Sequence, residues 1–199
     1  MNLSKTLTPR ILVVFIVEIL LILGLVVYAI LNVPPSSNPV LLSPDNSLYK
    51  EQQPKPVRLK IPKISVDALI EHKGITSNGE MDVPKNPSNT AWFSLGTRPG
   101  DEGSAVIGGH FGWRDNIPAV FDNLDKLQKG DVVLVEDEKG SNITFVVRES
   151  RIYNPKEYTP DIFVSNDDKA HLNLITCTGD WNKANKSYST RLVVFTDKE

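Results

Sequence analysis

From Val57 onward, short apolar runs alternate with polar residues, and Gly, Pro and Asn separate one run from the next. Such runs are typical of β-strands bounded by turns, and a long series of them indicates a closed or nearly closed β-structure. Eight runs fit this description: residues 57–64, 67–72, 90–95, 104–110, 130–137, 142–153, 170–177 and 189–197. The pattern predicts a mainly β fold for residues 57–199.

One segment of this region has a helical spacing instead. In Pro118–Leu127, the residues Val120, Leu124 and Leu127 fall on one side of a helix, and a proline lies near its start. We expect a short helix here that closes one end of the barrel.

The amino-terminal part has a different pattern. Ile11–Val33 is apolar except for Glu18 and Asn32, and it is long enough to cross a bilayer of about 30 Å as a helix. Lys5 and Arg10 precede this run, so residues 1–10 are expected in the cytoplasm and the rest of the chain outside. A cleaved signal peptide is the alternative interpretation.

The next segment, residues 34–56, is rich in proline, serine and amide side chains. This composition is typical of an extended spacer. The sequence thus predicts a membrane anchor at 11–33, an extracytoplasmic linker at 34–56 and a folded domain at 57–199.

The composition of the chain argues against several classes of function. The chain has 199 residues and a formal net charge of −2, and its basic residues do not cluster, so nucleic-acid binding is not expected. It also lacks a glycine-rich phosphate loop, paired cysteines and clustered histidines. We therefore expect neither a metal nor a cofactor.

The single cysteine, Cys177, is the first candidate for chemistry. Outside the cytoplasm cysteines are commonly paired in disulfides, and a lone one is either a small buried hydrophobe or a reactive group. Alternation in residues 170–177 places Cys177 at the end of a strand, on the face opposite Leu174 and Thr176. An antiparallel return would bring Arg191 beside the thiol.

A thiol nucleophile also needs an acid and base, and the chain has three histidines. His171 lies on the same strand as Cys177, roughly 20 Å away when extended, so it is excluded. His72 and His110 remain. Two glycines precede His110, where the backbone can approach another segment closely.

Three segments resemble the sortases, the membrane-anchored cysteine transpeptidases of mainly Gram-positive bacteria. They are Gly-Gly-His at 108–110, Leu-Ile-Thr-Cys at 174–177 and Ser-Thr-Arg-Leu-Val-Val-Phe at 189–195, in the family's order. The resemblance covers residues 57–198 and is strongest to the single-domain group called class F and its relatives. One departure is Asn173, which stands first in the family's Thr-Leu-x-Thr-Cys motif.

The resemblance implies an eight-stranded sortase barrel with one or two short helices, preceded by the transmembrane helix. It also implies that Cys177 is the nucleophile, His110 the general acid and base, and Arg191 the donor to the oxyanion or the substrate carbonyl. No cofactor is implied. Trp113 and Trp181 are expected to wall the cleft against a Leu-Pro ligand or to anchor their loops. Thr176 is expected to orient substrate or to pack in the core.

The implied substrates are surface proteins or pilins that carry a C-terminal Leu-Pro-x-Thr-Gly-like sorting signal. The implied acceptor is an amine of a peptidoglycan precursor or a pilin lysine. The sequence leaves open a thiol hydrolase with the same catalytic groups and a non-catalytic wall-binding module with a buried thiol.

Overall fold

The computed structural model describes residues 21, 23–25, 27–28, 54–113, 117–184 and 186–199. By its internal contacts, the chain divides into two units, residues 1–48 and 49–199. Most of the predicted anchor and linker at 11–56 lies outside the described residues. Among those that are described, no helix is both long and apolar enough to cross a membrane.

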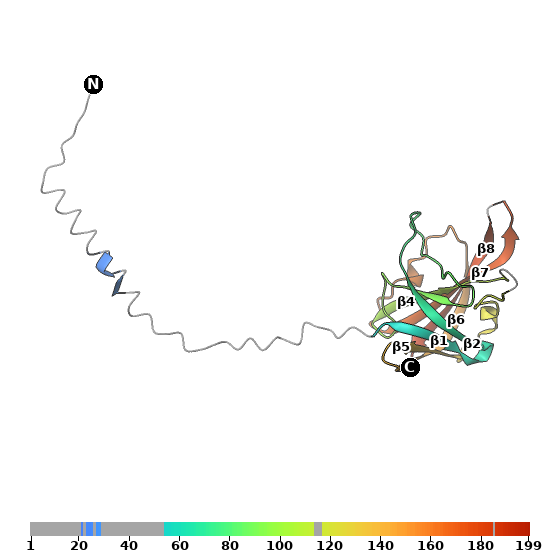
Figure 1. Cartoon of the computed structure of the whole chain (residues 1–199), viewed down its shortest axis with the longest axis horizontal. Helices are drawn as coiled ribbons and strands as arrows, with labels where there is room; N and C mark the ends of the chain where they lie inside the picture. The colour runs from blue at the N-terminus through green and yellow to red at the C-terminus, as the bar shows by residue number, and fades with distance from the viewer. Residues whose placement is uncertain (1–20, 22, 26, 29–53, 114–116, 185) are drawn as a thin grey trace, which may run out of the picture. The chain divides into compact units, whose positions relative to one another are not determined.

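The second unit is built from eight strands (Figure 1). Their bounds are β1 Pro56–Ile61, β2 Val66–Lys73, β3 Thr90–Phe93, β4 Gly103–Gly109, β5 Val132–Asp137, β6 Asn142–Tyr153, β7 Ala170–Asn182 and β8 Ser187–Lys198. They form one closed barrel in the order β1-β2-β3-β4-β7-β8-β6-β5. The predicted eight-stranded β-barrel is confirmed.

Pairing within the barrel is antiparallel except for β2 with β3 and β4 with β7. The parallel pair β4 and β7 places the end of the Gly-Gly-His segment next to the strand that carries Cys177, since Gly108 pairs with Ile175. His110, directly after β4, and Cys177, within β7, are thus brought to neighbouring positions although 67 residues separate them in sequence.

Alternation along β7 divides its side chains between two apolar clusters. Leu172 and Leu174 belong to the main core, which also contains Phe121, Leu124 and Phe145. Ile175, on the other face of β7, packs with a second cluster: Val106, Ile162, Val193 and Phe195. The predicted assignment of β7 residues to two faces is confirmed.

The prediction of one helix over Pro118–Leu127 is wrong. The structure has turns followed by a short 3₁₀ helix, Leu124–Lys126. The N–H groups of Asp122, Leu124 and Leu127 bond carbonyls three residues earlier in the chain, which gives turns and a 3₁₀ helix instead of the four-residue spacing of an α-helix. The apolar side chains still point inward, and Phe121, Leu124 and Leu127 lie in the main core.

Two further 3₁₀ helices, Pro62–Ile64 and Pro160–Ile162, complete the described helical structure of the second unit. Each begins with a proline, whose fixed φ suits the first turn of a helix. The first occupies the end of the run that the sequence predicts as strand 57–64, so β1 ends at Ile61.

The strand that carries the thiol is longer than predicted. β7 continues from Cys177 to Asn182, and the ladder with β8 shifts register between Thr178 and Trp181. The ends of β7 and β8 form a hairpin that projects from the barrel (Figure 1). Cys177 therefore lies just before an irregularity within a strand and not at the strand's end.

The two glycines before His110 differ in their surroundings, and this generates a stability prediction. A Cβ at Gly109 would lie 2.4 Å from Phe121 and 2.7 Å from Val120, whereas one at Gly108 would first meet the flexible end of Met81 at 3.3 Å. We expect Gly109→Ala to lower the free energy of unfolding by about 1–3 kcal/mol through overpacking, and Gly108→Ala by less than about 1 kcal/mol.

Chemical denaturation of the two variants beside the wild type measures both values. Equal losses in the two variants would contradict the close approach of Phe121 to Gly109.

Candidate active site

Cys177 and Arg191 are direct partners across the β7–β8 ladder. Side chains of directly opposed residues in antiparallel strands lie on the same face, with their Cβ atoms about 5 Å apart. The Arg191 Nη1 atom donates to the carbonyls of Thr190 at 3.0 Å and Tyr188 at 3.3 Å, which holds the guanidinium near the thiol. The predicted neighbourhood of thiol and guanidinium is confirmed.

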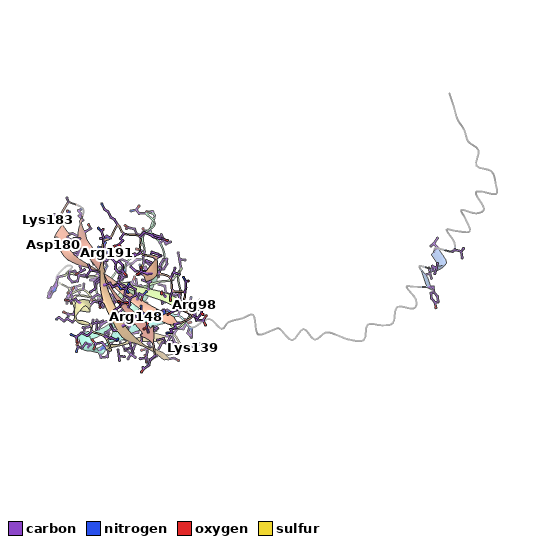
Figure 2. The ribbon with its side chains drawn as sticks, turned by 180° about the vertical axis from the view of Figure 1, so that it is seen from behind. Arg98, Lys139, Arg148, Asp180, Lys183 and Arg191 are labelled. Carbon is purple, nitrogen blue, oxygen red and sulfur yellow. The ribbon has the colours of Figure 1, made fainter. Side chains whose placement is uncertain are left out.

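Figure 2 shows where this arginine lies relative to others. Arg191 lies toward the end of the domain that carries Asp180 and Lys183 of the β7–β8 hairpin, whereas Arg148 lies farther along the barrel. Arg148 pairs there with Asp197. Arg151 likewise bonds Glu149.

His110 is the histidine that shares a cavity with Cys177. The cavity has a volume of about 610 Å³ and is also lined by Arg191. His72 bonds the Pro56 carbonyl at 2.8 Å and packs against Trp92, on another part of the barrel. His171 is buried, with its two ring nitrogens 2.7 Å and 2.8 Å from carboxylates of Asp197 and Asp167.

The ring of His110 is oriented by a backbone carbonyl. Its Nε2 lies 2.8 Å from the carbonyl oxygen of Pro84, which can only accept a hydrogen bond. In the neutral ring, Nε2 therefore carries the proton and donates it to this bond. Nδ1 remains the ring nitrogen that can exchange a proton with a ligand.

The segment that supplies this carbonyl is held by Glu71 of β2. The Glu71 carboxylate accepts hydrogen bonds from the backbone N–H groups of Lys85 and Asn86 and from the side chain of Asn89. Burial raises the pKa of Glu71, but these bonds and Lys73 outweigh burial and lower it to about 2. No sequence pattern indicates this role, because a glutamate in a strand is usually a solvated side chain.

The segment after His110 is fixed by Asp122 and Tyr188. Asp122 accepts from the Gly112 N–H at 2.7 Å and from the Ala119 N–H at 3.2 Å. Gly112 has a φ of 82°, and a Cβ there would lie 2.2 Å from the Tyr188 hydroxyl. Only glycine fits this turn, because a side chain would meet both a strained backbone and the tyrosine.

Aromatic side chains form much of the cavity wall. Tyr188 packs edge-on against Phe111 and Trp181, with ring centroids 5.2 Å and 5.0 Å away. Trp113 and Trp181 line the cavity, as expected from their positions after His110 and Cys177, and remain 72% and 50% exposed. Their exposed faces are available to a ligand. Contact with substrate stays a prediction.

Thr176 is buried at 3% exposure, and its hydroxyl donates to the Gly109 carbonyl at 2.8 Å. This bond extends the link between β4 and β7 one residue beyond their ladder, directly before both His110 and Cys177. Thr176 does not line the cavity. The structure thus gives it a positioning contact, and a contact with substrate stays a prediction.

Asn173, the departure from the family motif, is also buried. Its Nδ2 donates to the Ile162 carbonyl at 2.6 Å and so ties the 3₁₀ helix at Pro160–Ile162 to β7. A threonine would not offer this amide donor.

Burial raises the pKa of the Cys177 thiol, and the positive charge of Arg191 opposes that rise. The net direction is upward, so the resting group is a neutral thiol near pH 7. The arrangement can support nucleophilic attack by sulfur once a thiolate forms. It also offers a guanidinium for the developing negative oxygen and an imidazole for the proton.

Comparison with known proteins gives one family. The family model described as the Sortase domain matches residues 59–199. Sortase C-1 from Actinomyces oris has 27% identity and a TM-score of 0.57, with 73% of this chain and 75% of that chain covered. No curated protein matches the chain.

Two more distant structures share the fold. A lid mutant of sortase A from Corynebacterium diphtheriae has 20% identity and a TM-score of 0.58, covering 77% of this chain and 75% of that one. Sortase C from Clostridium perfringens SM101 has 21% identity and a TM-score of 0.53, covering 76% and 74%. The assignment to class F stays a prediction.

The lowered pKa of Glu71 predicts a pH-dependent stability. A depressed carboxyl pKa stabilises the fold above the unfolded value of 4.5, and this contribution is lost as the pH falls toward about 2. We expect Glu71→Gln to be less stable than the wild type at pH 6 by about 1 kcal/mol, since solvent screens a partly exposed carboxylate, and to lose less stability on acidification.

Urea unfolding at pH 6 and pH 3 measures this difference. Glu80→Gln, at an exposed site in the following loop, is the matched control and should follow the wild type. A Glu71→Gln profile parallel to that of the wild type would rule out the proposed anchoring of residues 84–89.

The raised pKa of Cys177 predicts slow alkylation at neutral pH. The alkylation rate should rise with pH to a midpoint above the ordinary cysteine value of about 8.5. Arg191→Gln removes the charge that favours the thiolate, so its midpoint should be higher still. Arg148→Gln should leave the midpoint unchanged. A wild-type midpoint below 8 would refute the assigned direction.

Proposed function

We propose that this chain, which belongs to the sortase family of cysteine transpeptidases, cleaves a Leu-Pro-x-Thr-Gly-like sorting signal and joins the protein to an amine. The observation that carries the proposal is one cavity lined by Cys177, His110 and Arg191, with the cysteine and the arginine directly opposed across a ladder. Surface proteins or pilins are the proposed donors, and a peptidoglycan precursor or a pilin lysine is the proposed acceptor.

In the first step, the Cys177 thiolate attacks the carbonyl carbon of the threonine in the sorting signal. The carbonyl electrons move to oxygen, and the Arg191 guanidinium donates hydrogen bonds to the resulting oxyanion. When the intermediate collapses, the C–N bond breaks and protonated His110 gives its proton to the departing amine. A thioester then joins the donor protein to Cys177.

In the second step, an acceptor amine attacks the thioester carbonyl. His110 takes a proton from the attacking nitrogen, and the C–S bond breaks as an amide forms. Sulfur leaves as the thiolate, so the catalytic pair returns to its starting charge. The same imidazole thus acts first as acid and then as base.

The neutral resting thiol limits the rate of this cycle. Attack needs thiolate and imidazolium together, and the pKa of Cys177 is raised by burial. Without strong coupling between the two groups, only a minor fraction of the protein carries both charges near pH 7. We expect slow turnover.

Substrate contacts are proposed for the tryptophans of the cavity wall. Trp113 and Trp181 present exposed aromatic faces beside the reactive groups, and such faces suit the apolar Leu-Pro part of the signal. An uncleaved helix at 11–33, with residues 1–10 in the cytoplasm, is proposed to keep the domain at the outer face of the cell membrane. The support for this location is the apolar run and the preceding Lys5 and Arg10.

The decisive experiment incubates the purified protein with a Leu-Pro-x-Thr-Gly peptide library, with and without added amines, and identifies products by mass spectrometry. We expect cleavage after threonine, a thioester on Cys177 and a product joined to the amine. Cys177→Ala should form none of these. His110→Ala and Arg191→Ala should lower kcat/KM by at least about 100-fold, the range for loss of a general acid or an oxyanion donor.

Other outcomes separate the alternatives. Cleavage without transfer to any amine indicates a hydrolase with the same catalytic groups. A folded protein with an alkylatable thiol that forms no thioester with any peptide contradicts the proposed substrate. Arg148→Ala is the matched control for Arg191→Ala and should retain full activity.

A further inference from the structure

A single backbone amide lies between the carboxylate of Glu71 and the ring of His110. On one side, the carbonyl oxygen of Pro84 lies 2.8 Å from the His110 Nε2 atom and accepts its hydrogen bond. On the other side, the N–H of Lys85 donates to both carboxylate oxygens of Glu71 at 3.1 Å. Pro84 and Lys85 are consecutive residues, so this carbonyl and this N–H belong to the same amide group.

The arrangement of the strands explains why a bridge is needed. Glu71 of β2 is paired with Ala91 of β3, and Ala91 is paired with Gly108 of β4. Neighbouring strands lie about 4.8 Å apart, so Glu71 is roughly 10 Å from the strand that leads into His110. This separation is too large for a direct hydrogen bond. Residues 84–89 contact both side chains and so connect them.

The amide can transmit the charge of the carboxylate. The Pro84–Lys85 peptide is trans, so its N–H and its C=O point in opposite directions. Hydrogen bonds that follow one another in a chain polarise each other. A carboxylate that accepts from the N–H therefore makes the carbonyl of the same amide a stronger acceptor. A stronger acceptor stabilises the protonated ring of His110 more than the neutral ring.

The carboxylate keeps its charge under the conditions of the reaction. Burial raises the pKa of Glu71, but its hydrogen bonds and Lys73 lower it to about 2. The Nζ atom of Lys73 lies 3.1 Å from Glu71 and 3.8 Å from Asp82, so one cation is shared between two carboxylates. The group of three side chains therefore retains a net negative charge near pH 7.

Other charged groups surround the same histidine. The titratable and charged side chains that line the cavity with His110 are Cys177, Lys186, Tyr188 and Arg191. The two cations among them disfavour a positive ring. Asp122 approaches the segment after His110, but its oxygens accept from the N–H groups of Gly112 and Ala119. Among the described side chains, Glu71 is the anion whose hydrogen bonds lead to the ring itself.

Resting on the proposed function, we infer that Glu71 is the positioning residue of the catalytic histidine, and that its charge reaches His110 through the Pro84–Lys85 amide. In the Ser-His-Asp arrangement, a carboxylate bonds the histidine directly. Here the carboxylate acts from behind one amide and does not line the cavity. It thus stabilises the proton donor to the departing amine while it stays away from the attacking sulfur, whose negative charge it would repel.

The pH dependence of kcat/KM for a Leu-Pro-x-Thr-Gly peptide tests the inference with the full chain. This constant covers the steps up to the thioester and reports the ionisation of the free enzyme. Attack needs thiolate and imidazolium together, and the thiol of Cys177 rests neutral, so the low-pH limb of the profile reports the ionisation of His110. A less stable imidazolium moves the midpoint of that limb to lower pH and lowers the plateau by the same factor.

Glu71→Gln keeps an acceptor oxygen for the Lys85 N–H and loses the charge. We expect it to lower the plateau of kcat/KM by about two- to fivefold, the range for one partly screened charge. The midpoint of the low-pH limb should move down by about 0.3–0.7 pH units. Well below the midpoint the rates of variant and wild type should coincide, because the ionisation of Cys177 alone then limits the active fraction.

Three further variants make the test specific. Lys73→Gln should move the midpoint in the opposite direction, because it removes a cation 3.1 Å from the same carboxylate. Asn89→Ala removes a side-chain bond to Glu71 and keeps the charge, so it should retain the wild-type midpoint. Glu80→Gln makes the same substitution at an exposed site in the neighbouring loop and should leave the whole profile unchanged.

An unchanged midpoint in Glu71→Gln overturns the inference, and so does a rate that falls by one factor at every pH, since the carboxylate would then only hold the loop. If thermal melting shows that Glu71→Gln does not fold, Lys73→Gln decides the question, and a midpoint that stays or moves down counts against the inference. These results leave the proposed function intact. Absence of a Cys177 thioester at every pH refutes the proposed function, and with it the catalytic role of Glu71.

Discussion

The register between β7 and β8 is the constraint on which the site depends. Because Cys177 is paired with Arg191, the backbone itself sets the distance between the thiol and the guanidinium. A shift of one residue would turn every β7 side chain to the opposite face. The thiol would then point into the core occupied by Leu172 and Leu174, and these leucines would face outward. The hydrophobic core therefore selects the register that assembles the site.

His110 is placed by a second set of contacts, of which only the one from Thr176 comes from this ladder. Its ring bonds the Pro84 carbonyl, its own carbonyl accepts from Phe121, and Thr176 bonds the carbonyl of the preceding Gly109. Two of these partners are backbone groups, which occupy fixed positions once the surrounding loops fold. The imidazole is thus oriented before a substrate arrives, at no cost in side-chain entropy during catalysis.

Much of this arrangement could be predicted from the sequence. The correct predictions rest on local patterns of apolar residues, and the wrong or missing ones concern contacts between distant parts of the chain. Alternating apolar residues identified the strands, and the opposition of Cys177 to Arg191 followed from an antiparallel return. The extension of β7 to Asn182 was missed because Thr178–Asn182 is polar, with a glycine and an aspartate that strands disfavour. The aromatic pair Trp181 and Tyr188 holds that part of the hairpin through tertiary contact.

Other features depend on contacts that no local pattern encodes. The segment at Pro118–Leu127 has helical spacing, but the N–H groups of Val120 and Phe121 bond Pro87 and His110 outside it, and its later N–H groups bond carbonyls three residues earlier instead of four. Glu71 and Pro84 were missed for the same reason, since one acts through a loop and the other through a backbone carbonyl. The choice between His72 and His110 needed family resemblance at the sequence level, and the cavity lining separates them by geometry.

Burial of the thiol has a consequence for the lifetime of the protein. Oxidation to sulfenic acid and beyond proceeds from the thiolate, so a cysteine that rests as the neutral thiol is oxidised slowly. Cys177 is the only cysteine of the chain, and no second thiol can return an oxidised sulfur through an internal disulfide. Cys177 cannot be reduced again by a second cysteine of the same chain, but it rests as the neutral thiol, which is the form that oxidises most slowly. Its low resting reactivity therefore lets each molecule complete more turnovers before the nucleophile is lost to oxidation.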